Sequence, residues 1–138
     1  MKKSIKILNI LLLLVLFSCV NIKSNKQRDI FLSEFFNTES VYNSLIDYYS
    51  NKSIIIYDKE KLLVQNSKEY GINNKVIDIV TEKPNKDYFV VYNFTLNKNL
   101  ATIVLATSNM DYGVIYYLKR NNENEKWTIM NIIPKNSR

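Results

Sequence analysis

Residues 88–120 read YFVVYNFTLNKNLATIVLATSNMDYGVIYYLKR, and this stretch decides the fold. Its first part carries an apolar or aromatic side chain at every second position, which is the period of a β-strand with one buried face. We expect these five side chains to point to one side of a sheet: Tyr88, Val90, Tyr92, Phe94 and Leu96. Residues 100–107 are apolar at both parities, which is typical of a central strand. Residues 114–120 predict the next strand.

Short polar connectors flank these strands at residues 83–86, 97–99, 108–111 and 121–125. They separate the strands from two further ones, expected at residues 76–80 and 126–133. Short connections between successive strands form hairpins, so the pattern predicts an antiparallel sheet of about five strands.

The N-terminal half favours helices. Residues 28–36 are very apolar, and residues 39–50 have apolar side chains at helical spacing behind a break and N-cap at Asn37-Thr38. The β-branched run at residues 53–57 predicts a strand. Asp58 could then cap a third helix through Tyr70, with Gly71 as its stop. The chain is therefore expected to be α+β, with helices packed on one face of a curved sheet.

The last two strands carry a resemblance. The segment Tyr116-Tyr117-Leu118-Lys119-Arg120, a polar turn, and then Lys126-Trp127-Thr128-Ile129 is similar to the final hairpin of many NTF2-like domains, and a cystatin-like sheet would read almost the same. The expected order of elements is similar too, over most of the chain. The resemblance implies a cone-shaped pocket, which in NTF2-like enzymes commonly holds an Asp-His or Asp-Tyr pair.

The chain has no His, so an Asp-Tyr pair is the version left to consider. The candidate pocket residues are Asp78, Tyr92 and Tyr116, with Tyr88, Tyr112 and Tyr117 as other tyrosines that could complete the pair. A buried Asp78 would have a raised pKa and could act as a general base. The alternative is an Asp78 that faces solvent or pairs with a lysine on a neighbouring strand.

Residues 1–19 have the parts of an export signal. Lys2, Lys3 and Lys6 form a positive start, and residues 7–17 form an apolar segment of roughly 16 Å as a helix, too short for the ~30 Å of a bilayer core. Leu16-Phe17-Ser18-Cys19 then resembles the lipobox of bacterial lipoproteins, although Phe17 departs from the small residue usual at its position. The resemblance implies a diacylglyceryl group on the sulfur of Cys19, and often an acyl chain on its amino group. An ordinary secretory signal and a signal-anchor are the alternatives.

These features divide the chain into a signal peptide at residues 1–18, the lipidated Cys19 with a flexible tether to residue 27, and one α+β domain at residues 28–138. Anchoring at the cell envelope follows, because two or three acyl chains on one residue hold a protein firmly to a membrane. The residue after the cysteine is Val20 rather than Asp, and the family's sorting rule then favours the outer membrane in a cell that has one.

Composition limits the chemistry. Without His, and with a single Cys, the chain has no Ser-His-Asp machinery, no imidazole metal site and no internal disulfide. Setting aside the three signal lysines leaves 16 basic against 13 acidic residues, a scattered excess of +3 that does not indicate nucleic-acid binding.

We therefore expect no cofactor, and an enzyme is disfavoured. The leading hypothesis is a non-enzymatic binding module with a protein partner, of which an immunity or inhibitor protein is one version. The alternatives are an NTF2-like small-ligand carrier or enzyme with an Asp-Tyr pocket, and a structural envelope lipoprotein.

Overall fold

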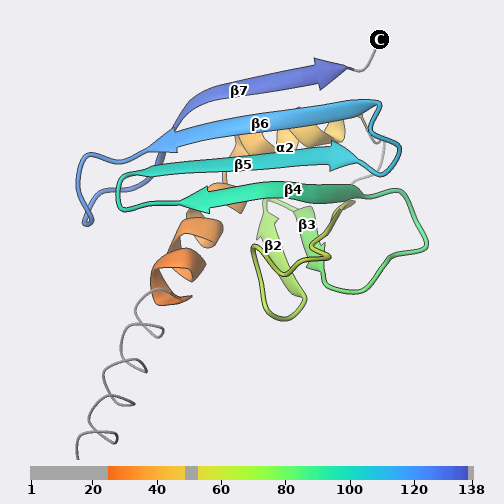
Figure 1. Cartoon of the computed structure of the whole chain (residues 1–138), viewed down its shortest axis with the longest axis horizontal. Helices are drawn as coiled ribbons and strands as arrows, with labels where there is room; N and C mark the ends of the chain where they lie inside the picture. Colours follow the sequence, from red (N-terminus) through yellow and green to blue (C-terminus); the bar gives the residue numbers. More distant parts are fainter. Residues whose placement is uncertain (1–24, 49–52, 137–138) are drawn as a thin grey trace, which may run out of the picture. The chain divides into compact units, whose positions relative to one another are not determined.

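A computed structural model of the chain describes residues 25–48 and 53–136 (Figure 1). The chain divides into two compact units, Met1–Phe31 and Leu32–Arg138. In the first unit, residues 25–31 are helical, and the Arg28 guanidinium donates a hydrogen bond of 3.1 Å to Oδ1 of Asn25. Residues 25–27, predicted as the end of the tether, are thus helical. The signal sequence, the lipobox and Cys19 lie outside the described residues. Among the residues described, no helix has the length and apolar character needed to cross a membrane.

The second unit begins with helical residues 32–36 and continues with helix α2, Glu39–Ile46. Thr38 takes the N-cap position of α2 with an extended backbone, as predicted. Its hydroxyl, however, donates to the backbone carbonyl of Glu34 at 2.8 Å instead of accepting from the first turn of α2. The buried residues of α2 are Val41, Tyr42 and Leu45. Their spacing places them on one side of the helix, which is the amphipathic pattern that the sequence predicted.

Seven strands form one open sheet in the order β2-β3-β1-β4-β5-β6-β7. They are β1 Ser53–Tyr57, β2 Lys68–Ile72, β3 Lys75–Val80, β4 Phe89–Leu96, β5 Leu100–Thr107, β6 Tyr112–Lys119 and β7 Thr128–Asn136. The α+β class and the antiparallel pairing of β4 to β7 are confirmed, but the sheet has seven strands where about five were expected, and it is not antiparallel throughout. Strand β1 runs parallel to both β3 and β4, and the other neighbours are antiparallel. A parallel pair needs a long connection, and here the loop after β1 together with β2 provides it, so that β3 can pair with β1 in the same direction.

The helix predicted from Asp58 to Tyr70 is absent, and an irregular loop followed by β2 takes its place. Asp58 is fully buried, and its carboxylate accepts three backbone N–H bonds, from Leu62 and Leu63 at 2.8 Å and from Val64 at 2.9 Å. Its carboxylate therefore organises a loop and does not cap a helix.

Gly71 lies within β2 and is not a helix stop. A two-residue turn follows, in which Asn73 and Asn74 have positive φ angles of 48° and 63°. Positive φ at both central residues is the geometry of a tight hairpin turn, and asparagine tolerates it better than most residues. This turn joins β2 to β3.

A β-bulge at Tyr92 breaks the alternation expected along β4. Val91 pairs with Leu105, and Asn93 pairs with the next residue of β5, Val104, so one residue of β4 has no partner. Before the bulge, Phe89 and Val91 are the buried residues; after it, Phe94 and Leu96 pair with buried residues of β5. The predicted common face of Tyr88, Val90, Tyr92, Phe94 and Leu96 is therefore wrong, because the extra residue changes the parity midway.

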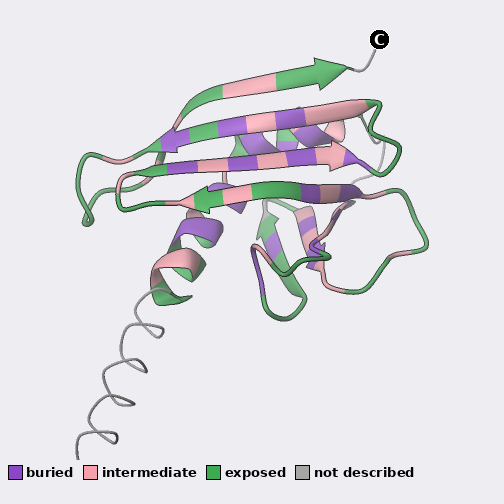
Figure 2. Ribbon diagram, viewed as in Figure 1, coloured by how far each residue is buried: buried purple, intermediate pink, exposed green. Residues whose placement is uncertain are grey.

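The sheet has one buried face and one open face. Figure 2 shows the alternation of buried and partly exposed residues along β5 and β6. Helix α2 lies on the buried face, behind β5 and β6 in Figure 1, where Ser44 contacts Tyr116 and Glu39 pairs with Lys75. The residues of the buried face include Ile54, Ile56, Ile77, Ile79, Phe89, Val91, Ile103, Leu105, Val114, Tyr116 and Leu118.

Candidate functional site

Tyr116 belongs to the core and holds α2 against the sheet. Its side chain is 0% exposed, and its hydroxyl lies 2.7 Å from Oγ of Ser44. Ser44 Oγ donates its proton to the carbonyl of Val41, so the phenol of Tyr116 is the donor to Ser44. The hydroxyl of Tyr112 donates to the backbone carbonyl of Ser44 at 3.0 Å. Burial raises the pKa of Tyr116 well above its ordinary value and also raises that of Tyr112.

Asp78 lies on the other face of the sheet. Its neighbours along β3, Ile77 and Ile79, are buried, so the side chain of Asp78 points to the open face, where it is partly exposed. Oδ2 of Asp78 accepts a long hydrogen bond of 3.4 Å from Ser53, and Asp78 pairs across the strands with Glu69. The structure thus separates Asp78 from Tyr116 by the thickness of the sheet.

The other predicted tyrosines are also dispersed. Tyr92 is 47% exposed at the bulge of β4, and Tyr117 is 43% exposed on the open face. The ring of Tyr88 packs against that of Tyr57, with centroids 5.7 Å apart. A pocket beside Trp127 is lined neither by Asp78 nor by any of these tyrosines.

The open face of the sheet is the first candidate surface. We define it by the outward residues of the strands, which alternate with the buried ones and include Ile55, Tyr57, Val90, Val104, Ile115, Tyr117 and Ile133. Strands β1, β4 and β5 carry no charged residue. Charged outward side chains lie toward the two edges of the sheet, Glu69 and Asp78 at one edge and Lys119 and Lys135 at the other.

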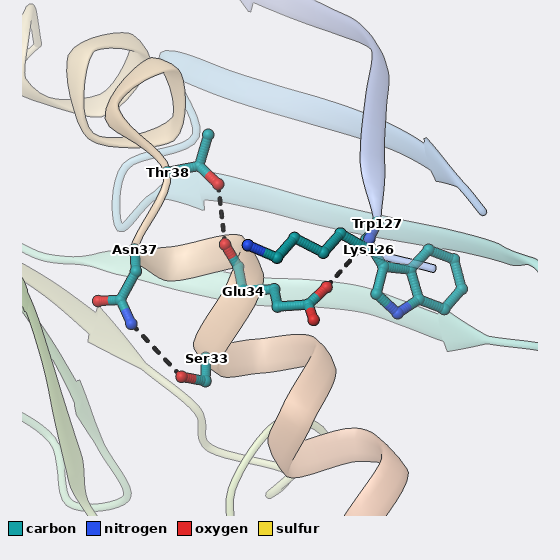
Figure 3. Close-up of a pocket in the computed structure, with 6 residues that line it drawn as sticks. All are labelled: Ser33, Glu34, Asn37, Thr38, Lys126 and Trp127. Atoms are coloured by element: carbon teal, nitrogen blue, oxygen red, sulfur yellow. Dashed lines mark hydrogen bonds between the residues drawn. The ribbon is translucent and has the colours of Figure 1, made fainter. Parts of the chain in front are cut away.

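The second candidate surface is a groove of about 390 Å³ beside Trp127, which we call the Trp127 groove (Figure 3). Its lining comes from the end of the first helical segment and from the residues just before β7. These residues are Ser33, Glu34, Asn37, Thr38, Lys126 and Trp127. Figure 3 shows Lys126 extending along Glu34 toward the end of the helical segment.

Backbone contacts fix the position of Glu34 in this groove. Its Oε2 accepts the backbone N–H of Trp127 at 3.0 Å, a link between residues 93 positions apart. The Trp127 ring is held by Arg120, whose guanidinium carbon lies 4.7 Å from the ring centroid. Arg120 in turn donates to the carbonyl of Lys98 at 2.8 Å and to that of Glu123 at 3.2 Å. The walls of the groove are therefore held by the fold before any ligand arrives.

Sequence reasoning did not identify the Trp127 groove. The sequence carries two signals for it: the only tryptophan of the chain, and the polar residues Ser33 and Glu34 within an apolar helical segment, with Asn37 directly after it. Neither shows that the two segments meet.

The described residues define an α+β protein with two surfaces that could bind a partner or a ligand. Among them there is no group of three or more His, Cys, Asp or Glu side chains placed to hold a metal ion. No family model, curated protein or solved structure matches the chain.

Proposed function

We propose that this protein is a lipid-anchored bacterial lipoprotein whose α+β domain is a non-enzymatic binding module for a protein partner. The observation that carries the proposal is the open face. Its central strands carry no charge, and the face combines aliphatic side chains with the partly exposed Tyr57 and the exposed Tyr117. Depletion of charge with enrichment of tyrosine is typical of the core of protein interfaces. Tyrosine suits this role because it offers a large contact area and a polar tip.

The anchor is supported by the sequence alone. The lysines of the start, the short apolar segment and Cys19 follow one another in the order of a lipoprotein signal. Lipidation of Cys19 would place the domain at the cell envelope, and Val20 favours the outer membrane where there is one. An immunity or inhibitor role is one concrete version of the binding module.

The finer fold assignment also remains a proposal. The N-terminal helices and the C-terminal antiparallel meander, β4 to β7, support an NTF2-like or cystatin-like relationship, although β1 to β3 lie between them in the chain. The carrier or enzyme alternative needs Asp78 and a tyrosine in one pocket. Because Asp78 and Tyr116 lie on opposite faces, the open face is the better candidate.

Affinity capture from envelope membranes tests the binding module. With the full lipidated chain as bait, we expect one stoichiometric partner, and Tyr117→Lys should reduce its recovery at least about tenfold, because a charge would be buried at the interface. Met110→Lys is the matched control, because Met110 is 58% exposed in the loop between β5 and β6, outside the open face. Repeated failure to recover a partner, or equal losses in both variants, would contradict the proposal.

The anchor has a separate test. Cys19→Ala should leave the chain without the added lipid mass and release it from the membrane fraction. Unchanged mass and unchanged membrane retention would refute lipidation at Cys19.

A further inference from the structure

We propose that the Trp127 groove is a saccharide-binding site, independent of the open face. The groove volume of about 390 Å³ lies at the lower end of the range of small-molecule sites, which is about 300–1,000 Å³. It is thus suited to a ligand of one or two sugar rings. The Trp127 groove lies on the helical side of the sheet, so a saccharide could bind there while a protein occupies the open face.

The lining chemistry favours a ligand that both donates and accepts hydrogen bonds. Lys126 and Asn37 offer N–H donors, while Oε1 of Glu34 and Oδ1 of Asn37 are acceptors without a partner among the described residues. Each sugar hydroxyl can donate one bond and accept others, so it can satisfy both kinds of group. An apolar ligand would strip water from these side chains without replacing the lost bonds.

The charges of the groove do not favour a ligand of one sign. Glu34 and Lys126 line the same groove with opposite charges, so for an anion or a cation the attraction by one is offset by repulsion from the other. A neutral polyhydroxylated ligand avoids both repulsions and can still form charge-assisted hydrogen bonds with each residue. This combination points to a saccharide in preference to a carboxylate, a phosphate or an amine.

Trp127 is the aromatic residue of the lining, and the Arg120 guanidinium lies over its ring. The apolar contact that a sugar ring also needs would come from the part of the indole that borders the groove. Trp127 lines the groove, and the contact with Arg120 and the bond from its backbone to Glu34 hold it in place. A fixed ring and a fixed carboxylate reduce the conformational entropy that binding would otherwise cost.

Fluorescence provides a direct test, because Trp127 is the only tryptophan in the chain. The probes are the disaccharide of N-acetylglucosamine, cellobiose and maltose, titrated into the full chain in detergent. We expect at least one of them to change the Trp127 emission saturably and to shift the NMR signals of the Trp127 backbone amide and the Asn37 side-chain amide.

Two groove variants and a matched pair of controls assign the site. Glu34→Gln keeps an acceptor for the Trp127 N–H but removes the charge, and Lys126→Met keeps the stem of the side chain. Each should weaken binding about fivefold or more, because a charge-assisted hydrogen bond becomes a weaker one or is lost. Glu60→Gln and Lys59→Met are the controls, since this exposed pair lies 3.6 Å apart in the loop after β1. They should leave the affinity unchanged.

Three results would overturn the proposal. They are the absence of any spectral change with all three probes up to their solubility, equal affinity in the groove and control variants, and saturation of the same signals by acetate or phosphate alone. The open-face proposal is tested by Tyr117→Lys and partner capture, so either proposal can fail without the other.

Discussion

Asp58→Ala should lower the free energy of unfolding by about 4 kcal/mol, a large share of the 5–15 kcal/mol that is ordinary for a domain. The Asp58 side chain has no exposed surface, and its two oxygens accept the N–H groups of Leu62, Leu63 and Val64. Truncation to alanine leaves all three donors without their acceptor, although none of the three residues changes.

The magnitude follows from the environment of these donors. The bonds from Leu63 and Val64 are buried, and an orphaned buried donor costs about 1–3 kcal/mol. The bond from Leu62 is partly buried, so water can replace it at a smaller cost. Asp58→Asn should fall between, at about 2 kcal/mol, because the amide keeps one acceptor oxygen but turns an N–H group toward a backbone donor.

Urea titration of each variant, followed by Trp127 fluorescence and by circular dichroism, measures these losses. Asp78→Asn is the matched control: the same substitution at a partly exposed aspartate with a single hydrogen bond of 3.4 Å should change stability by less than about 0.5 kcal/mol. A loss below about 1 kcal/mol in Asp58→Ala, or equal losses at the two positions in the Asn variants, would refute this account of the loop.

Two further predictions concern Tyr116 and the β2–β3 turn. The pKa of Tyr116 is raised in the folded state. Its contribution to the free energy of unfolding is therefore complete below the unfolded-state pKa of about 10 and declines at higher pH, where Tyr116 ionises first in the unfolded chain. Tyr116→Phe should cost about 1 kcal/mol at neutral pH and flatten the alkaline decline, as measured by urea titrations from pH 7 to 11; an unchanged alkaline slope would contradict this reading. Asn74 has a φ of 63°, which glycine adopts readily and a β-branched residue resists. Asn74→Gly should therefore raise Tm by about 2–3 °C, and Asn74→Val should lower it, as measured by scanning calorimetry. The opposite order of Tm values would contradict this geometry of the turn.

The strands that alternate or run continuously apolar could be predicted from the sequence. Residues 100–107 form β5 with the predicted bounds, and α2 begins at the predicted Glu39. The sequence could not distinguish the helix predicted from Asp58 from a loop. A carboxylate that accepts hydrogen bonds from nearby backbone N–H groups can stand at the start of a helix or of a loop. A helix cap binds the N–H two or three residues on, whereas Asp58 binds those four to six residues on.

The bulge shows a second limit of periodicity. Tyr92 is aromatic, so an inserted residue looks like a continuation of the alternating pattern, and only the pairing of β4 with β5 exposes it. Periodicity also predicts that Asp78 shares one face of its strand with Val76 and Val80. It does not show which of the two faces of the sheet a helix covers. That choice is made by α2, which packs on the other side.

The Trp127 groove depends entirely on tertiary structure. Glu34 and Trp127 are linked by one hydrogen bond across 93 residues, and no local pattern encodes such a contact. Sequence could supply candidate residues for a site, as it did with Asp78, Tyr92 and Tyr116, but not which of them share a surface.

The junction between β1 and β4 has a consequence for how the protein opens. Among the described residues these strands pair at only two positions, Ile56 with Phe89 and Tyr57 with Val90, while β4 to β7 pair along most of their lengths. The β2-β3-β1 block and the β4–β7 meander are therefore expected to behave as separate foldons in native-state hydrogen exchange. The meander closes through local hairpins, whereas the junction needs a parallel, sequence-distant pairing, so the slow step of folding should be the docking of the two blocks.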